Sequence, residues 1–317
     1  MGNIRHPRRG SLQFWPRKRS KHALARPRSW VQESKTKPLA FIGYKAGMTH
    51  LMVVDNRPKS LTKGETIAVP ATIIECPPVK VVGISFYSQT YDGLRKTGAI
   101  MSAHLDKELS RTIPLPKTAK NVKTDFPAQF DDLRLLVQTA SPEAKKPHLL
   151  EIAIGGTKDD KVKYAHTMLD KEIALGDVFQ PGHSLDVHGV TTGKGFQGTV
   201  KRYGVPIRQH KAEKTKRGIA TLGSWTPKRV EWTVAQSGKM GYHLRTEYNK
   251  QILKIGTQVN DVNPKGGIIR YGLVQYPYLL IKGSVVGPPK RAVVMTPSLR
   301  PNLQMTKEAP EIKYISH

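Results

Sequence analysis

The sequence has little of what secreted proteins, membrane proteins and most enzymes depend on. A single cysteine, Cys76, excludes a disulfide framework and a cysteine-rich zinc site. Aromatic residues make up only 7% of the 317 residues, which is low for a compact enzyme of this length. The mean hydropathy is −0.44, and no long stretch is free of charge, which excludes a transmembrane helix. The first 30 residues contain no apolar run, so we expect no secretory signal.

Acidic residues are also scarce, and their distribution is uneven. The chain has 52 lysines and arginines against 24 acids, a net charge of +28, and it repels itself unless a polyanion neutralises it. Residues 106–186 hold 13 of the acids against 12 basic residues, so the excess charge lies elsewhere. It is concentrated in residues 1–30 and 190–230, which lack apolar residues at helical or strand spacing. We expect both segments to become ordered on the phosphates of a partner; the alternative is a solvated arm and a solvated loop.

The apolar residues outside these blocks predict a mainly β fold. Segments rich in Val, Ile and Thr recur with turn residues between them, which indicates a barrel or a sandwich. The near-neutral stretch 91–173 is expected to decorate one side of that module, with a helix start that leads into a strand in 129–139 and a short helix at 161–172. Residues 241–256 are expected to be partly helical or irregular. The expected strands are 39–48, 51–54, 66–76, 79–87, 148–155, 174–190, 267–271, 278–281 and 292–295.

No group of residues indicates catalysis or metal binding. Residues 189–194 (GVTTGK) resemble a nucleotide-binding phosphate loop, but the loop is one residue short and Gly195 replaces the Mg²⁺-binding hydroxyl. Its glycines would still let the backbone approach a phosphate closely. His183 and His188 lack a third ligand, and Cys76 lies in an apolar run typical of an inert core thiol. We therefore expect no enzymatic activity, no cofactor and no metal.

Basic residues interleaved with glycine on irregular backbone suit a folded RNA, whose phosphates face many directions. Duplex DNA would instead favour a regular basic helix or ribbon. Phe14, Trp15 and Trp30 of the arm could be received by bases or by an apolar groove. Two alternatives stay open. An RNA-modifying enzyme would need a cofactor motif, and none is visible; a DNA-compacting protein would bind duplex DNA as tightly as RNA.

Five segments, taken together, resemble the universal large-subunit ribosomal protein L3 family in its archaeal–eukaryotic form. They are 41–50 (FIGYKAGMTH), 186–204 (DVHGVTTGKGFQGTVKRYG), 222–227 (LGSWTP), 241–249 (GYHLRTEYN) and 283–291 (GSVVGPPKR). The resemblance covers nearly the whole chain in order, and the chain length favours an archaeal form. It implies a structural constituent of the large ribosomal subunit, located in the cytoplasm. Such a protein binds rRNA, supports early assembly and shapes the region around the peptidyl-transferase centre during translation.

The resemblance further implies partners, fold and division of the chain. The partners are large-subunit rRNA and neighbouring ribosomal proteins, with no membrane and no small-molecule substrate. The fold is a closed, translation-protein-like β-barrel with an inserted α/β decoration and basic extensions. The expected segments are a basic rRNA-binding arm (1–37), the first barrel segment (38–90), the near-neutral insertion (91–173), a barrel return (174–189), a central basic extension or finger (190–256), and the last barrel segment with the C-terminal tail (257–317).

The site residues that we predict lie in the arm and in the extension. By the resemblance, the tip of the finger near the peptidyl-transferase centre is formed by Gly223, Ser224 and Trp225, and not by Trp232. The predicted rRNA-binding residues are Arg5, Arg8, Arg9, Arg17, Lys18, Arg19, Lys194, Lys201, Arg202, Arg208, Lys211, Lys214, Lys216, Arg217, Lys228, Arg229, His243 and Arg245.

Overall fold

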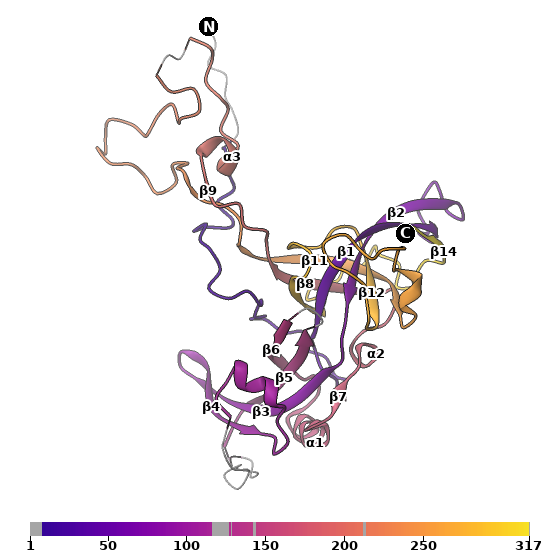
Figure 1. The fold of residues 1–317 in the computed structure, drawn as a ribbon. Helices are drawn as coiled ribbons and strands as arrows, with labels where there is room; N and C mark the ends of the chain where they lie inside the picture. The colour runs from indigo at the N-terminus through magenta and orange to yellow at the C-terminus, as the bar shows by residue number, and fades with distance from the viewer. Residues whose placement is uncertain (1–7, 116–126, 128, 142–143, 212–213, 317) are drawn as a thin grey trace. The chain divides into compact units, whose positions relative to one another are not determined.

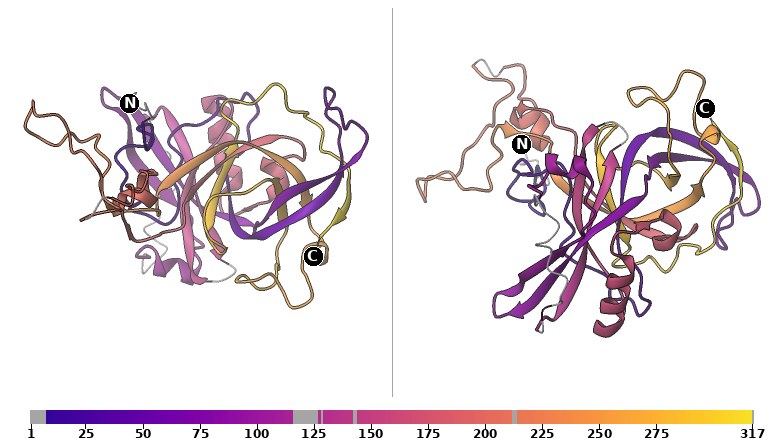
Figure 2. Two further views of the ribbon diagram at one scale, coloured as in Figure 1. Left: turned by 90° about the horizontal axis from the view of Figure 1, so that it is seen from above. Right: turned by 60° about the horizontal axis from the view of Figure 1, so that its bottom comes forward.

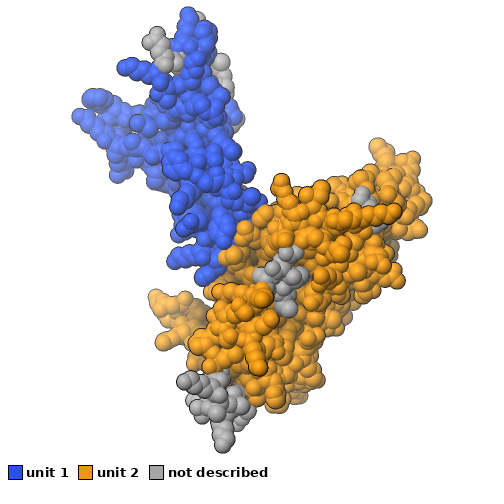
Figure 3. All heavy atoms as spheres, viewed as in Figure 1, with its two compact units in different colours: residues 1–22, 190–244 blue, residues 23–189, 245–317 orange. Residues whose placement is uncertain are grey.

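The computed structural model describes residues 8–115, 127, 129–141, 144–211 and 214–316. The chain divides into two compact units, which Figure 3 colours separately. Unit 1 comprises residues 1–22 and 190–244, and unit 2 comprises residues 23–189 and 245–317. Within the described ranges, none of the helices has the length and apolar character that crossing a membrane requires.

Unit 2 contains a curled seven-stranded sheet, which can be followed in Figures 1 and 2. The strand order is β13-β8-β11-β12-β2-β1-β14, and β1 pairs with β13 as well, antiparallel, so the sheet bends back on itself. The segment 190–244 of unit 1 lies in the chain between β8 and β11, which are neighbours in this sheet. The strands are β1 (Phe41–Val54), β2 (Thr66–Glu75), β8 (Ser184–Val190), β11 (Leu244–Gly256), β12 (Tyr278–Lys282), β13 (Ala292–Pro297) and β14 (Ile312–Ile315).

A second, five-stranded sheet forms the rest of the β-structure of unit 2. Its order is β4-β3-β5-β6, and the short β7 pairs with β3. The strands are β3 (Val79–Thr90), β4 (Gly93–Met101), β5 (Asp132–Ser141), β6 (Ala144–Ala153) and β7 (Glu172–Ile173). The helices of unit 2 are short: η1 (Lys107–Arg111), α1 (Lys158–Met168), α2 (Leu175–Val178) and η3 (Val259–Asp261).

The two sheets share one apolar core, in which Phe41, Tyr44, Phe86 and Tyr278 are among the largest fully buried side chains. The β-branched runs of the sequence supply this core, as their pattern predicts. Unit 2 therefore obtains its stability in the usual way, by removing apolar side chains from water.

Hydrogen bonds within unit 2 join some of the segments that resemble the L3 family to one another. The ammonium group of Lys45 donates to the carbonyls of Val285 (2.5 Å) and Gly287 (2.9 Å), which joins segment 41–50 to segment 283–291. The buried Asp186 carboxylate accepts the backbone N–H of Asn249 (2.8 Å), which joins segment 186–204 to segment 241–249. These residues hold unit 2 together.

The mainly β prediction is confirmed, with differences in detail. The expected strands 66–76, 278–281 and 292–295 are present, and the expected helix at 161–172 overlaps α1, which spans Lys158–Met168. The segment 174–190 is a strand only from Ser184, because Leu175–Val178 form α2. Segment 79–87, expected in the barrel, instead pairs as β3 with β4, β5 and β7 in the five-stranded sheet. Segment 267–271 is a turn closed by a bridge between Ile268 and Gly272, not a strand. Residues 244–256 form a strand instead of irregular or helical structure, and segment 132–141 is a strand without a helical start.

The first prediction concerns Glu75, a fully buried carboxylate at the end of β2. It accepts the Tyr271 hydroxyl and the backbone N–H groups of Gln275 (2.7 Å) and Tyr276 (2.9 Å). Glu75→Ala should lower the free energy of unfolding by about 3 kcal/mol, because buried donors left without an acceptor cost about 1–3 kcal/mol each. Urea unfolding of the full chain measures this. The exposed Glu65→Ala serves as the control. An equally small effect of both changes would contradict the role of Glu75 as a buried acceptor that stabilises the fold.

The second prediction concerns pH. Burial lowers the pKa of His148 and of His188, and the Lys146 charge lowers that of His148 further, whereas Asp186 opposes the shift at His188. The unfolded chain then binds more protons, so the melting temperature should fall as pH decreases from about 7.5 to about 5.5. Replacing both histidines by Gln should flatten this dependence, and exposed His104→Gln should not. A melting temperature that stays constant over this range in the wild-type chain would contradict the prediction.

Candidate nucleic-acid interface

Unit 1 brings the two most basic segments of the chain together. Residues 1–22 and 190–244 contain 18 lysines and arginines but two acids, Glu213 and Glu231. Glu213 lies outside the described residues. Among the residues of unit 1 that are described, Arg229 and Glu231 form the only ion pair, at 3.7 Å and largely exposed. Unit 1 thus carries more than half of the net charge of +28, and among its described residues a single ion pair offsets it.

Unit 1 has little regular structure and little apolar core. Strand β9 (Phe196–Gln197) pairs with β10 (Gly238–Lys239), and helix α3 (Thr199–Tyr203) ends at Gly204, which has a positive φ of 70°. Across its described residues, the buried side chains are Val190, Thr199, Tyr203 and Ala235. Hydrophobic burial alone therefore does not explain how the unit holds its shape.

Backbone contacts attach the N-terminal arm to the end of the central segment. The N–H of Ser20 donates to the carbonyl of Tyr242 (2.7 Å). The Nε2 atom of His243 accepts the N–H of Gly241 (3.1 Å), so Nδ1 carries the hydrogen and donates to the carbonyl of Lys18 (2.9 Å). Both ring nitrogens of His243 are thus used inside the protein, although the sequence suggested His243 as an rRNA-binding residue.

The structure separates the predicted rRNA-binding residues into two groups. Arg17, Arg202 and Arg208 are half-buried and donate to backbone carbonyls, and exposed Arg8 donates to the carbonyl of Thr233 (2.5 Å). Arg245 lies on β11 in unit 2, and Arg5 lies outside the described residues. The residues whose side chains are exposed are Arg9, Lys18, Arg19, Lys194, Lys201, Lys211, Lys214, Lys216, Arg217, Lys228 and Arg229.

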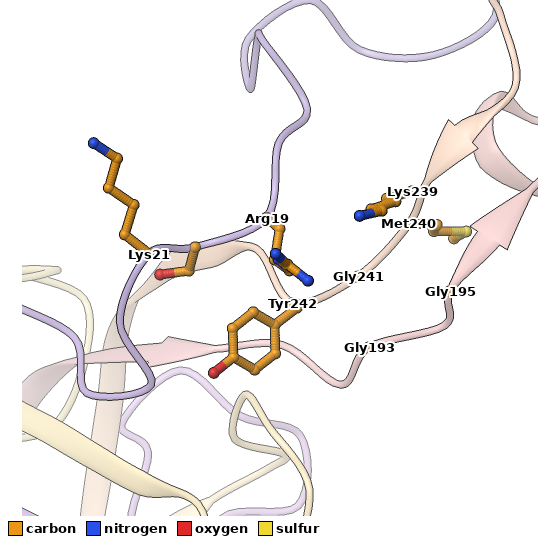
Figure 4. A pocket seen from close by; sticks show the side chains of 9 residues that line it. Arg19, Lys21, Gly193, Gly195, Lys239, Met240, Gly241 and Tyr242 are labelled. Atoms are coloured by element: carbon orange, nitrogen blue, oxygen red, sulfur yellow. The ribbon is translucent and has the colours of Figure 1, made fainter.

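A cavity of about 650 Å³ opens between the arm and the glycine-rich segments. Arg19 and Lys21 line it from the arm, and Lys239 lines it from β10; Figure 4 shows Arg19 and Lys239 extending toward the same opening. Gly193, Gly195 and Gly241 form much of the remaining wall. A polar opening with cations and exposed glycine backbone suits an anion.

The glycine at position 241 is required by the backbone. Its φ is +76°, and a Cβ atom built on Gly241 would lie 2.1 Å from the carbonyl oxygen of Thr192. The close approach keeps the backbone of 239–242 against 192–195. Lys21 and Lys239 were absent from the predicted site residues. Lys21 lies in the basic block 1–30, whereas Lys239 lies beyond the block 190–230 and two residues before the family-like segment 241–249.

The predicted tip residues surround an exposed indole. Trp225 is 81% exposed, and the Nζ of Lys228 lies 4.9 Å from its ring centroid. Gly223 has φ +144°, and the Ser224 hydroxyl donates to the carbonyl of Thr226 (2.8 Å). An indole that packs on the protein would be covered, so this geometry favours a role toward a partner.

The other tryptophans of the basic segments are differently placed. Trp15 of the arm lies with its ring centroid 5.3 Å from that of Trp232 and 6.3 Å from that of Tyr203. Trp30 belongs to unit 2 and packs against its core. Trp15 and Trp30, suggested as rings for bases or a groove, thus both contact the protein itself.

The described residues contain no cluster of three or more His, Cys, Asp and Glu side chains that could hold a metal ion. Burial raises the pKa of the Cys76 thiol well above its usual value, which makes it a poor nucleophile. His188 is held between the hydroxyls of Thr246 (2.9 Å) and Thr296 (3.1 Å) in unit 2.

The sequence is similar to known proteins over its whole length. A family model described as "Ribosomal protein L3" matches residues 1–138 and 133–317. The "Large ribosomal subunit protein uL3" of Methanothrix thermoacetophila is 41% identical over 328 residues, which cover 100% of this chain and 98% of the relative. The proteins with the same name from Methanocaldococcus jannaschii and Methanothermobacter thermautotrophicus are 44% and 42% identical. They cover 99% and 100% of this chain, and 97% and 98% of the relatives.

Proposed function

The chain belongs to the ribosomal protein L3 family, of archaeal type, and on that premise we propose that unit 1 binds large-subunit rRNA. As a member of this family the chain is a structural constituent of the large ribosomal subunit and not an enzyme. The proposed function includes support for early subunit assembly and for the shape of the region around the peptidyl-transferase centre. Its partners are rRNA and neighbouring ribosomal proteins.

One observation carries the proposal: unit 1 exposes many cations and has almost no carboxylates to pair with them. Ammonium and guanidinium groups on irregular backbone suit phosphates that turn in different directions, as in folded RNA. Each phosphate that is neutralised releases counterions, which gives RNA binding its strong salt dependence.

The cavity at Gly241 supplies a concave region of the same interface. Arg19 and Lys239 can hold one phosphate there, while the glycines let the RNA backbone come close. Trp225 is suited to stacking on an unpaired base, and the nearby Lys228 adds charge for the adjoining phosphate. We infer that the arm and the segment from 190 onward form the two rRNA-binding extensions.

Unit 2 is the module from which these extensions depart. The pairing of β1 with β13 supports a closed barrel made from the strands of the larger sheet. The five-stranded sheet would then be the decoration on that barrel, and it includes β3, which the sequence pattern assigns to the barrel.

The third prediction concerns the slope of binding affinity against salt. Replacing Lys194, Lys201, Lys216 and Arg217 by alanine should flatten the slope of log K against log salt by about three, since each phosphate contact contributes about 0.7–0.9. Filter binding of the full chain to a large-subunit rRNA fragment measures the slope, and competition with duplex DNA tests the DNA-compacting alternative. A matched variant with four exposed lysines of unit 2 replaced (Lys59, Lys63, Lys107 and Lys145) controls for net charge. Equal slopes for the unit 1 variant and the wild-type chain would contradict the proposed interface.

The fourth prediction concerns Trp225. Stacking is worth about 1–3 kcal/mol per base, which is small beside many phosphate contacts, so Trp225→Ala should enter the subunit in near-normal amounts. The loosened tip should change peptidyl transfer severalfold, measured as puromycin reactivity of purified particles. Trp225→Phe, which keeps an aromatic face, should restore most of the activity. Normal reactivity of the alanine variant would contradict the tip assignment, and an unfolded free variant would show that Trp225 is a core residue.

A further inference from the structure

Two arginines from distant segments of the chain bind each other's backbone inside unit 1. Nη1 of Arg17, in the arm, donates to the carbonyl of Arg202, in α3, at 2.5 Å. Nη2 of Arg202 donates in return to the carbonyl of Arg17 at 3.1 Å. The two residues are 185 positions apart in the sequence, so this reciprocal contact joins the arm to the central segment.

The Arg202 guanidinium also reaches a third segment. Its Nε donates to the carbonyl of Lys239 (3.1 Å), and its Nη1 donates to the carbonyl of Gln236 (3.0 Å). All three nitrogens of this side chain therefore donate to carbonyls. One carbonyl belongs to the arm, and the other two belong to residues 236–239, which include β10. A lysine could not reproduce this pattern, because its ammonium is a single point without the planar fork of a guanidinium.

The ring of Tyr203 packs against the guanidinium groups of both arginines. Its side chain is 5% exposed, with the Cζ of Arg17 at 4.2 Å and the Cζ of Arg202 at 5.2 Å from the ring centroid. Trp15 lies against the same ring, and Trp232 lies against Trp15. Cation–π and aromatic contacts of this kind stabilise a site that has few aliphatic side chains.

Two glycines make room for this cluster. A Cβ atom on Gly10, which has φ +83°, would lie 2.3 Å from the Tyr203 ring and 3.2 Å from Nη2 of Arg17. A Cβ atom on Gly238 would lie 2.9 Å from Nη1 of Arg202. A side chain at Gly10 would therefore collide with the Tyr203 ring at a strained backbone, and one at Gly238 would displace the Arg202 guanidinium.

We propose that Arg17 and Arg202 form a clamp that holds the N-terminal arm against the central segment, and that neither residue is a phosphate ligand. The clamp is defined by Arg17, Arg202, Tyr203, Gly10 and Gly238. Nη1 and Nη2 of Arg17 and all three nitrogens of Arg202 already donate to carbonyls, so a phosphate bound by both Nη groups of either side chain would compete with those bonds. Both are positioning residues: they set where the exposed cations of the arm lie. The effect on RNA binding rests on the proposed function, whereas the clamp itself does not.

The test combines one charge-conserving change with a matched control. Arg202→Lys keeps the charge but removes the planar guanidinium, and Arg95→Lys makes the same change at an exposed arginine of unit 2, on β4. Hydrogen exchange is followed at the amide of Ser20, whose N–H donates to Tyr242. The full chain is measured at low salt, both free and in the presence of a saturating concentration of a large-subunit rRNA fragment.

In Arg202→Lys we expect the Ser20 amide to exchange at least about tenfold faster, because local opening of the arm becomes easier. Its affinity for the rRNA fragment should fall while the salt slope stays unchanged. In Arg95→Lys, exchange and affinity should both stay at the wild-type level, because Arg95 lies in unit 2, outside the proposed rRNA interface. Gly238→Ala should reproduce the faster exchange without altering any charge.

Three results would overturn the clamp. One is unchanged exchange in both Arg202→Lys and Gly238→Ala; another is fast exchange of Ser20 in the wild-type complex. The third is an Arg202→Ala variant that lowers the salt slope by about 0.7–0.9 with exchange unchanged, which would make Arg202 a phosphate ligand. A wild-type slope near zero would instead contradict the proposed rRNA binding, and the exchange result would still decide the clamp.

Discussion

The positive charge of unit 1, which contains two carboxylates against 18 basic residues, is the constraint on which the rest of this structure depends. Like charges oppose any compact arrangement of the arm and the central segment. Acidic side chains could hold the segments together, but they would cancel the charge that an RNA partner needs. Backbone carbonyls avoid this conflict, because they accept hydrogen bonds from Arg17 and Arg202 and leave the net charge unchanged. The cations of unit 1 accordingly divide into some that bind the protein and many that face outward.

Unit 2, in contrast, is stabilised by a conventional apolar core. Its few buried carboxylates, such as Glu75 and Asp186, are satisfied by backbone N–H groups and fix turns and strand ends. The central segment of unit 1 is inserted between β8 and β11, neighbouring strands of one sheet. Both ends of this segment, which has little apolar core of its own, are therefore joined to strands of one sheet. The L3 family supplies the setting in which such an extension is useful, since the interior of a ribosomal subunit is rich in RNA phosphates.

Much of this could be predicted from the sequence. The β-branched runs such as 66–76 and 292–295 located strands, and the family-like segments pointed to L3. The polyanion partner that the composition indicates stays a prediction. The pairing of strands was harder to predict from the sequence. Strand β3 is as apolar as β2, and periodicity does not say which sheet a strand joins. Residue roles were harder still. Arg202 and its exposed neighbour Lys201 look alike in the sequence, and only contacts with residues far along the chain distinguish them.

A cryo-electron microscopy map of the large ribosomal subunit that contains this chain would test the division of cations in unit 1 most directly. We predict rRNA phosphate oxygens within about 3 Å of exposed groups such as Lys194, Lys201 and Arg217. We also predict that Arg17 and Arg202 still bind backbone carbonyls and that Trp225 lies against a base. The opposite pattern would contradict this division: exposed cations of unit 1 facing solvent or protein, with phosphates bound at Arg17 and Arg202.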